Sequence, residues 1–173
     1  MGALVAALRT GPRATRAAAL ARLREIPVDA ATLRSLIERE VEAIRLDLVH
    51  LHGLGTGPVS DLVLQRLRER VDESAHTTLL LLAALHHEDR IANLGHLLVR
   101  SGGGRARAVL LEALESLLPP AERARLMPLL DDTASAAVTA AAALGRDLPS
   151  FDDALRETLA GQSICLHPCD EER

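Results

Sequence analysis

The chain has 173 residues, a formal net charge of −4 and 48% hydrophobic residues, which predicts one soluble domain with a sizeable core. Phe151 is its only aromatic residue, and all 20 basic residues are arginines interspersed with acidic ones. These features exclude obvious stacking platforms for bases and a continuous basic stripe, so sequence-specific binding of nucleic acid is not expected.

The cellular compartment is indicated by what the chain lacks. Cys165 and Cys169 both lie within the last nine residues, which is no disulfide framework. The N-terminus does not have the charged and apolar regions of a signal peptide. The longest apolar runs, such as residues 79–85, are far shorter than the roughly 20 residues that span a bilayer. We therefore expect a cytoplasmic protein with no membrane insertion.

Prolines, glycines and capping residues divide the chain into about eight helices, with no strand pattern. The expected helical ranges are 2–9 (a short turn), 12–26, 30–52, 60–87, 89–100, 105–118, 120–130, 136–144 and 151–159. Asp29, Ser60 and Ser150 are suitable N-caps, and Gly145 is a suitable C-cap. The fold class is therefore predicted to be all-α.

The order and connection of these helices indicate how they pack. Short connections between successive helices favour an irregular HEAT-like α-solenoid rather than a closed bundle. Residues 79–85 are apolar on all sides and should lie at the centre of the core. Leu97 and Val109 are expected to face inward as well. We predict a single domain at 1–161 and a disordered tail at 162–173.

A family resemblance covers residues 30–160. The sequence RARAVLLEALESLLPPAERARLMPLLD at 105–131, with an upstream Glu-Arg and long apolar helix, resembles the HEAT-like helical region of some bacterial membrane proteins. Those proteins carry a nucleotide-translocase, major-facilitator-type transporter domain, often with a cyclic-nucleotide-binding domain nearby. The matching positions are Arg105, Ala106, Ala108, Glu112, Leu114, Leu117, Leu118, Pro128, Leu129, Leu130 and Asp131.

The resemblance implies a cytoplasmic regulatory or docking module. This chain departs from the group because it has neither transmembrane spans nor a cyclic-nucleotide pocket. Its tail also stops where a further helical repeat would be expected. Transport by this chain is therefore not implied.

Two carboxylate–histidine patterns, Asp47-x-x-His50 and Glu73-x-x-His76, have the spacing that di-iron helical bundles use. At about 100° per residue, both patterns point away from the apolar stripes of their helices. Ligands of a buried di-metal site must project inward, so we predict that neither pattern binds a metal.

A second cluster contains His86, His87, Glu88 and Asp89, with His96 further along. It falls at a predicted helix end, where histidine is normally solvated or caps the last turn. We therefore expect structural roles for these residues.

Two further patterns are incomplete. Cys165, His167 and Cys169 form C-x-H-x-C, which supplies three of the four ligands of a structural zinc site, so metal binding there stays open. Residues 101–104 are glycine-rich but follow a helix rather than a strand, and no lysine is present to contact a phosphate. No catalytic residue, cofactor site or metal site is predicted.

The leading hypothesis is a non-catalytic helical-repeat scaffold that binds a protein partner or a neighbouring domain. One alternative is a detached cytoplasmic regulatory domain of a membrane transporter. Another is an enzyme, either a metal-dependent helical bundle or a HEAT-like DNA glycosylase, although the missing aromatic residues count against the latter. The C-terminal end, at the alanine-rich helix 136–144, is expected to be an association surface. Deleting residues 147–173 should then expose Ala137, Ala141 and Leu144. The alternative is that the last helix, 151–159, is a sufficient polar cap.

Overall fold

The computed structural model describes residue 3 and residues 6–8, 13–22, 28–101, 104–130 and 133–163. Every regular element in these ranges is an α-helix, which confirms the all-α prediction. The helices with described bounds are α2 (Arg13–Arg22), α3 (Ala30–Leu54), α4 (Asp61–His86), α5 (Asp89–Arg100), α6 (Gly104–Leu117), α7 (Pro120–Leu130), α8 (Thr133–Ala143) and α9 (Phe151–Ser163). None of the described helices is both long and apolar enough to cross a membrane.

Capping side chains start the two longest helices where the sequence predicted. The Thr32 N–H donates to Asp29 Oδ1 at 2.8 Å at the start of α3. The Leu62 N–H donates to Ser60 Oγ at 3.3 Å at the start of α4. Gly145, with φ of 64°, follows α8 in the left-handed conformation that a helix C-cap favours. These local signals are strong because each satisfies backbone groups that a helix end leaves unpaired.

Two helices extend further than their predicted ranges, 30–52 and 151–159, and each continues through a glycine. α3 continues through Gly53 to Leu54, and α9 continues through Gly161 to Ser163. A Cβ atom added at Gly53 would lie 2.7 Å from the Cβ of Ala154. Gly53 therefore allows α9 to approach α3 closely. α9 therefore includes the first two residues, 162 and 163, of the predicted tail, and residues 164–173 lie outside the described part.

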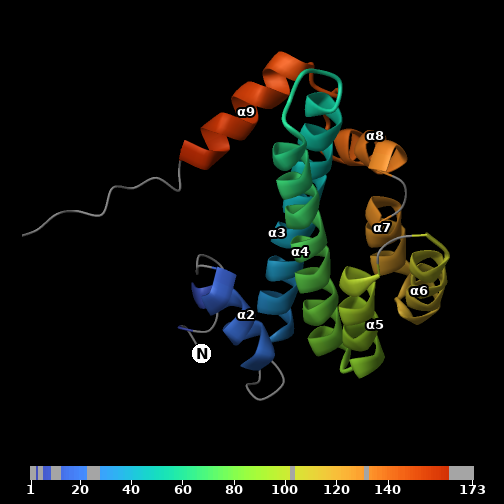
Figure 1. The fold of residues 1–173 in the computed structure, drawn as a ribbon. Helices are drawn as coiled ribbons and strands as arrows, with labels where there is room; N and C mark the ends of the chain where they lie inside the picture. The colour runs from blue at the N-terminus through green and yellow to red at the C-terminus, as the bar shows by residue number, and fades with distance from the viewer. Residues whose placement is uncertain are drawn as a thin grey trace, which may run out of the picture.

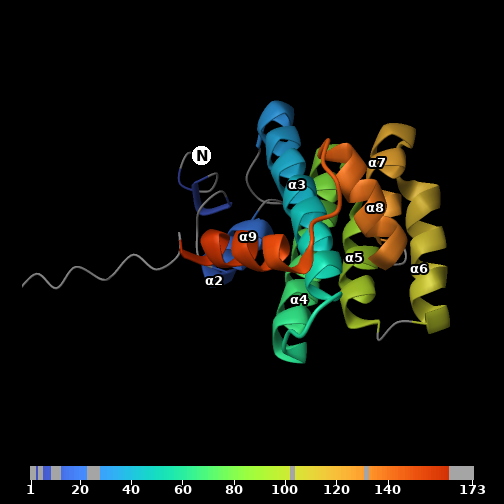
Figure 2. The same ribbon diagram turned by 90° about the horizontal axis from the view of Figure 1, so that it is seen from above.

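The helices are arranged around a central antiparallel hairpin formed by α3 and α4 (Figure 1). α2 lies on one side of this hairpin, and α5, α6 and α7 lie on the other side. Seen from above, α6 forms the outer edge of the molecule (Figure 2). α8 and α9 both pack on α3 near its C-terminal end.

The contacts between successive helices form a closed circuit, because the last of these helices packs on α3. α4 packs on α5, α5 on α6, α6 on α7 and α7 on α8, and α8 then packs on α3. In a strict solenoid each repeat contacts only its neighbours along the chain. Here α3 is covered by α4, α8 and α9, so it is buried on several sides.

The centre of the core lies where the sequence predicted. Leu79, Leu81 and Leu82 of α4 are at most 1% exposed. They belong to a large apolar cluster that extends from α3 to α8. A smaller cluster, including Leu51 and Ala154, holds α9 against the end of the central hairpin. The apolar run 79–85 thus lies at the centre of the core, although Leu80, Ala84 and Leu85 are only partly buried.

The alanine-rich face of α8 packs on α3 and is already covered there, which contradicts the hypothesis that this end of the stack is an association surface. Ala137 is 0% exposed and Ala141 is 4% exposed, and Leu144 is partly buried. Small side chains let α8 approach α3 closely, and the return of the chain onto α3 covers the face that a linear stack would have left open.

Candidate interaction site

Asp47 is buried, contrary to the predicted outward direction of the first carboxylate–histidine pattern. Its side chain is 4% exposed, and Oδ1 lies 2.9 Å from Arg70 Nη2 of α4. Burial raises the pKa of Asp47, while electrostatic interactions with Arg70, and then with His50, oppose this effect. The prediction failed because α3 has a wider buried surface than one apolar stripe. The pair joins the two helices of the central hairpin.

His50 is also largely buried and contacts α9. Its Nε2 lies 3.0 Å from Glu157 Oε2, and Arg146 Nη2 donates to Glu157 Oε1 at 2.8 Å. The hydrogen bond from Arg146, and then that from His50, lowers the pKa of Glu157. The Glu157 carboxylate is thus used to position α9 on α3.

His76 of the second pattern faces α5, which again corrects the predicted outward direction. Its Nε2 lies 3.0 Å from Nδ1 of His96, with 4.7 Å between the ring centroids. Gly95 permits this approach, since a Cβ there would lie 3.2 Å from the Cβ of Leu79. Burial, and then the neighbouring His96, lowers the pKa of His76. Glu73 is partly exposed and lies one turn earlier on α4.

Residues 86–89 lie where α4 ends and α5 begins, as predicted. His96 lies apart from them, against His76. His87 is the C-cap of α4, in the left-handed conformation with φ of 52°. Glu88 caps α5 by accepting from the Arg90 N–H at 3.2 Å. Hydrogen bonds from Arg90 lower the pKa of Glu88 to about 2. These residues therefore form a turn between two helices.

The remaining sequence patterns are only partly visible. Cys165, His167 and Cys169 lie outside the described residues, as do residues 102–103 of the glycine-rich break. Gly104 begins α6. In the part of the chain that is described, no three histidine, cysteine, aspartate or glutamate side chains gather closely enough to hold a metal ion.

An apolar groove lies between the end of α5 and the start of α6. Its lining residues are Leu97, Arg100, Ser101, Arg105, Ala106, Val109 and Leu110. Leu97 is 53% exposed and Val109 is 57% exposed, although the sequence predicted that both face inward. The difference arises because α6 packs on α5 and α7 with one face only, around Leu114. Clustered exposed apolar side chains mark interaction sites.

One sequence signal could have revealed this groove. α5 carries apolar residues on two faces, since Ile91 and Leu98 are buried whereas Leu97 and Val99 are about half exposed. A helix at a simple surface needs a single apolar stripe. Apolar residues beyond that stripe therefore indicate a second contact.

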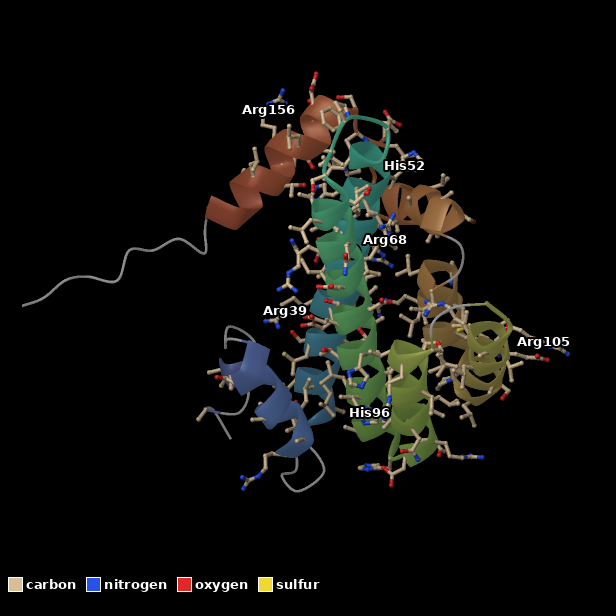
Figure 3. All side chains as sticks on the ribbon, in the orientation of Figure 1. Arg39, His52, Arg68, His96, Arg105 and Arg156 are labelled. Carbon is tan, nitrogen blue, oxygen red and sulfur yellow. The ribbon has the colours of Figure 1, made fainter. Side chains whose placement is uncertain are left out.

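The rim of the groove is basic. Arg100 and Arg105 are exposed and make no ion pair with any described residue. Arg105 projects from the outer edge of the molecule (Figure 3). By contrast, Arg66 and Arg90 each pair with a nearby carboxylate on the same helix or turn. The groove thus combines apolar side chains with guanidinium groups that are available to a partner.

A second hollow, between α3, α4 and α7, is lined by Thr78, Leu82 and Arg125 among others. It has room for about one water molecule, so it is too small for a substrate. The groove between α5 and α6 is the better candidate for binding.

No family model, curated protein or solved structure matches this chain. The functional assignment therefore depends on the geometry of the groove.

Proposed function

We propose that this chain is a non-catalytic helical scaffold that binds a protein through the groove between α5 and α6. The observation that carries the proposal is the exposure of Leu97 and Val109 in one groove. Each square ångström of apolar surface removed from water stabilises a complex by about 25 cal/mol before the costs of association. Arginine, present here as Arg100 and Arg105, is enriched among residues that dominate binding energy.

A HEAT-like stack, in a cytoplasmic setting, is part of the same proposal. It is supported by the successive packing of α4 to α8, each helix on the next. The packing of α8 and α9 back on α3 makes this stack short and covers one of its ends. The open edge is at α6, where a partner or a neighbouring domain would dock (Figure 2).

A site-specific photocrosslinker tests the proposal directly. Placed at Val109 in cells of the native host, it should yield a reproducible crosslink to one protein, identified by mass spectrometry. Val138 of α8 is the matched control, because it is a valine with 56% exposure on another helix. Leu97→Asp should remove the crosslink from position 109. Equal yields at the two positions, or none at 109, would contradict the proposal.

A further inference from the structure

The exposed face of α6 carries a regular sequence of side chains. Arg105, Val109, Glu112 and Ser116 are all exposed. At about 100° per residue, they fall within an arc of about 60° along one side of the helix. The order along this stripe is basic, apolar, acidic and polar. Its first two members, Arg105 and Val109, also line the groove.

The two charges on this stripe have no partner in the described chain. Neither Arg105 nor Glu112 makes an ion pair there. Seven residues separate them, which is about 10 Å along a helix axis, so they do not pair with each other. By contrast, Asp47 and Arg70 of the central hairpin pair with each other across α3 and α4.

This pattern is complementary to itself. In a two-fold symmetric pair of antiparallel helices, if residue i faces residue j, then j also faces i. With the axis between Ala108 and Val109, Arg105 faces Glu112 of the partner subunit, and Glu112 faces the partner subunit's Arg105. The small side chain of Ala108 then faces Val109 of the partner subunit, which allows close approach.

We propose that the α6 face binds a second copy of this chain in this antiparallel arrangement. The inference rests on the proposed function, because it names the occupant of the same groove. Two ion pairs set the register and orientation, and burial of Val109 and Leu97 supplies the apolar contact. A foreign acidic helix would satisfy Arg100 and Arg105 but would place like charge opposite Glu112. A second copy of this chain places an acidic side chain opposite Arg105 and a basic side chain opposite Glu112.

The apolar contact is small, so the dimer is weak and forms reversibly with rising concentration. Sedimentation velocity of the full chain over a concentration series measures it. Arg105→Glu and Glu112→Arg should each weaken association by about tenfold or more, because each places two like-charge pairs in the interface. The double variant Arg105→Glu/Glu112→Arg should restore association, since both pairs re-form with reversed sign.

Mixing the two single variants gives the sharpest result. In the mixture, one subunit is acidic at both positions and the other is basic at both. Both ion pairs therefore form between unlike subunits, and a heterodimer should appear although each variant alone associates at least about tenfold more weakly than the parent. Arg68→Glu, a charge reversal at an exposed site on α4, is the matched control and should leave association unchanged.

A wild-type chain that stays monomeric, or single variants that do not form a heterodimer when mixed, would overturn the inference. If the crosslink at position 109 then identifies a different protein, the scaffold proposal stands and only its occupant is wrong. If position 109 also gives no crosslink, both proposals fail.

Discussion

The central hairpin and the α5–α6 edge are both rich in leucine and valine, yet their side chains have opposite surroundings. Leu79 and Leu82 of α4 are at most 1% exposed, whereas Leu97 and Val109 are more than half exposed. α3 and α4 are covered on several sides, while α6 has neighbours on one face only. Burial here is decided by how many helices surround an element more than by its apolar content.

Charged residues show the same contrast. At the hairpin, Asp47 is buried and paired with Arg70 across the two helices. At the edge, Arg105 and Glu112 are exposed and make no ion pair within the described part of the chain. The Asp47–Arg70 pair therefore joins two helices, whereas Arg105 and Glu112 have no charged partner among the described residues.

The largest expected effect comes from the hairpin. Leu82→Ala should destabilise the fold by about 2 to 5 kcal/mol, because it leaves a cavity in close-packed surroundings. Leu82→Asp should prevent folding, since it would bury an unpaired charge. Denaturant titration followed by circular dichroism measures both. Leu62→Asp, at a site that is 73% exposed, is the control and should remain folded. A folded and stable Leu82→Asp variant would refute the assignment of the core.

The sequence was sufficient to locate the helices but not to orient them. Asp29, Ser60 and Gly145 predicted helix ends correctly because capping is local chemistry. Asp47 and Val109 were misplaced because the inward direction of a helix depends on neighbours distant in the chain. An apolar stripe gives one average direction. α3 is covered by neighbouring helices on several sides, so Asp47 is buried although it lies off the apolar stripe. α6 is covered on one face only, so Val109 stays exposed.

The second effect concerns the ion pair inside the hairpin. Arg70→Ala leaves the Asp47 carboxylate buried without its partner, which should destabilise the fold by about 1 to 3 kcal/mol. The loss is smaller than for a fully buried ion pair, because the Arg70 side chain is 46% exposed. Arg66→Ala is the matched control, because it breaks an exposed pair with Glu69 and should cost less than about 1 kcal/mol. If Arg70→Ala and Arg66→Ala lower the free energy of unfolding equally, the Asp47–Arg70 pair contributes no more to stability than an exposed pair.

The pH dependence of this loss provides a further check. The pKa of Asp47 is already raised above its ordinary 3.8 by burial, and removal of Arg70 should raise it further. Protonation removes the buried charge and so stabilises the folded state of the variant. The difference in unfolding free energy between Arg70→Ala and the parent should therefore shrink as the pH is lowered towards 4. A constant difference would contradict this account.

A smaller effect is expected where the hairpin meets the edge, at His76 and His96. The pKa of His76 is lowered in the folded chain from its ordinary 6.5, so protons bind the unfolded chain more readily. Stability should therefore decrease as the pH falls below about 6.5. His76→Gln removes this titration, and its unfolding free energy should fall less than that of the parent between pH 7 and pH 5. If the unfolding free energies of His76→Gln and the parent fall equally between pH 7 and pH 5, groups other than His76 cause the pH dependence.

The central proposal is that the hairpin stabilises the fold, whereas the α5–α6 edge binds a second copy of this chain. Val109→Asp tests it most directly when unfolding and sedimentation are measured on the same sample. The variant should unfold within about 0.5 kcal/mol of the parent, as surface substitutions do, while concentration-dependent association is lost. A loss of several kcal/mol in stability, or association equal to that of the parent, would contradict the claim.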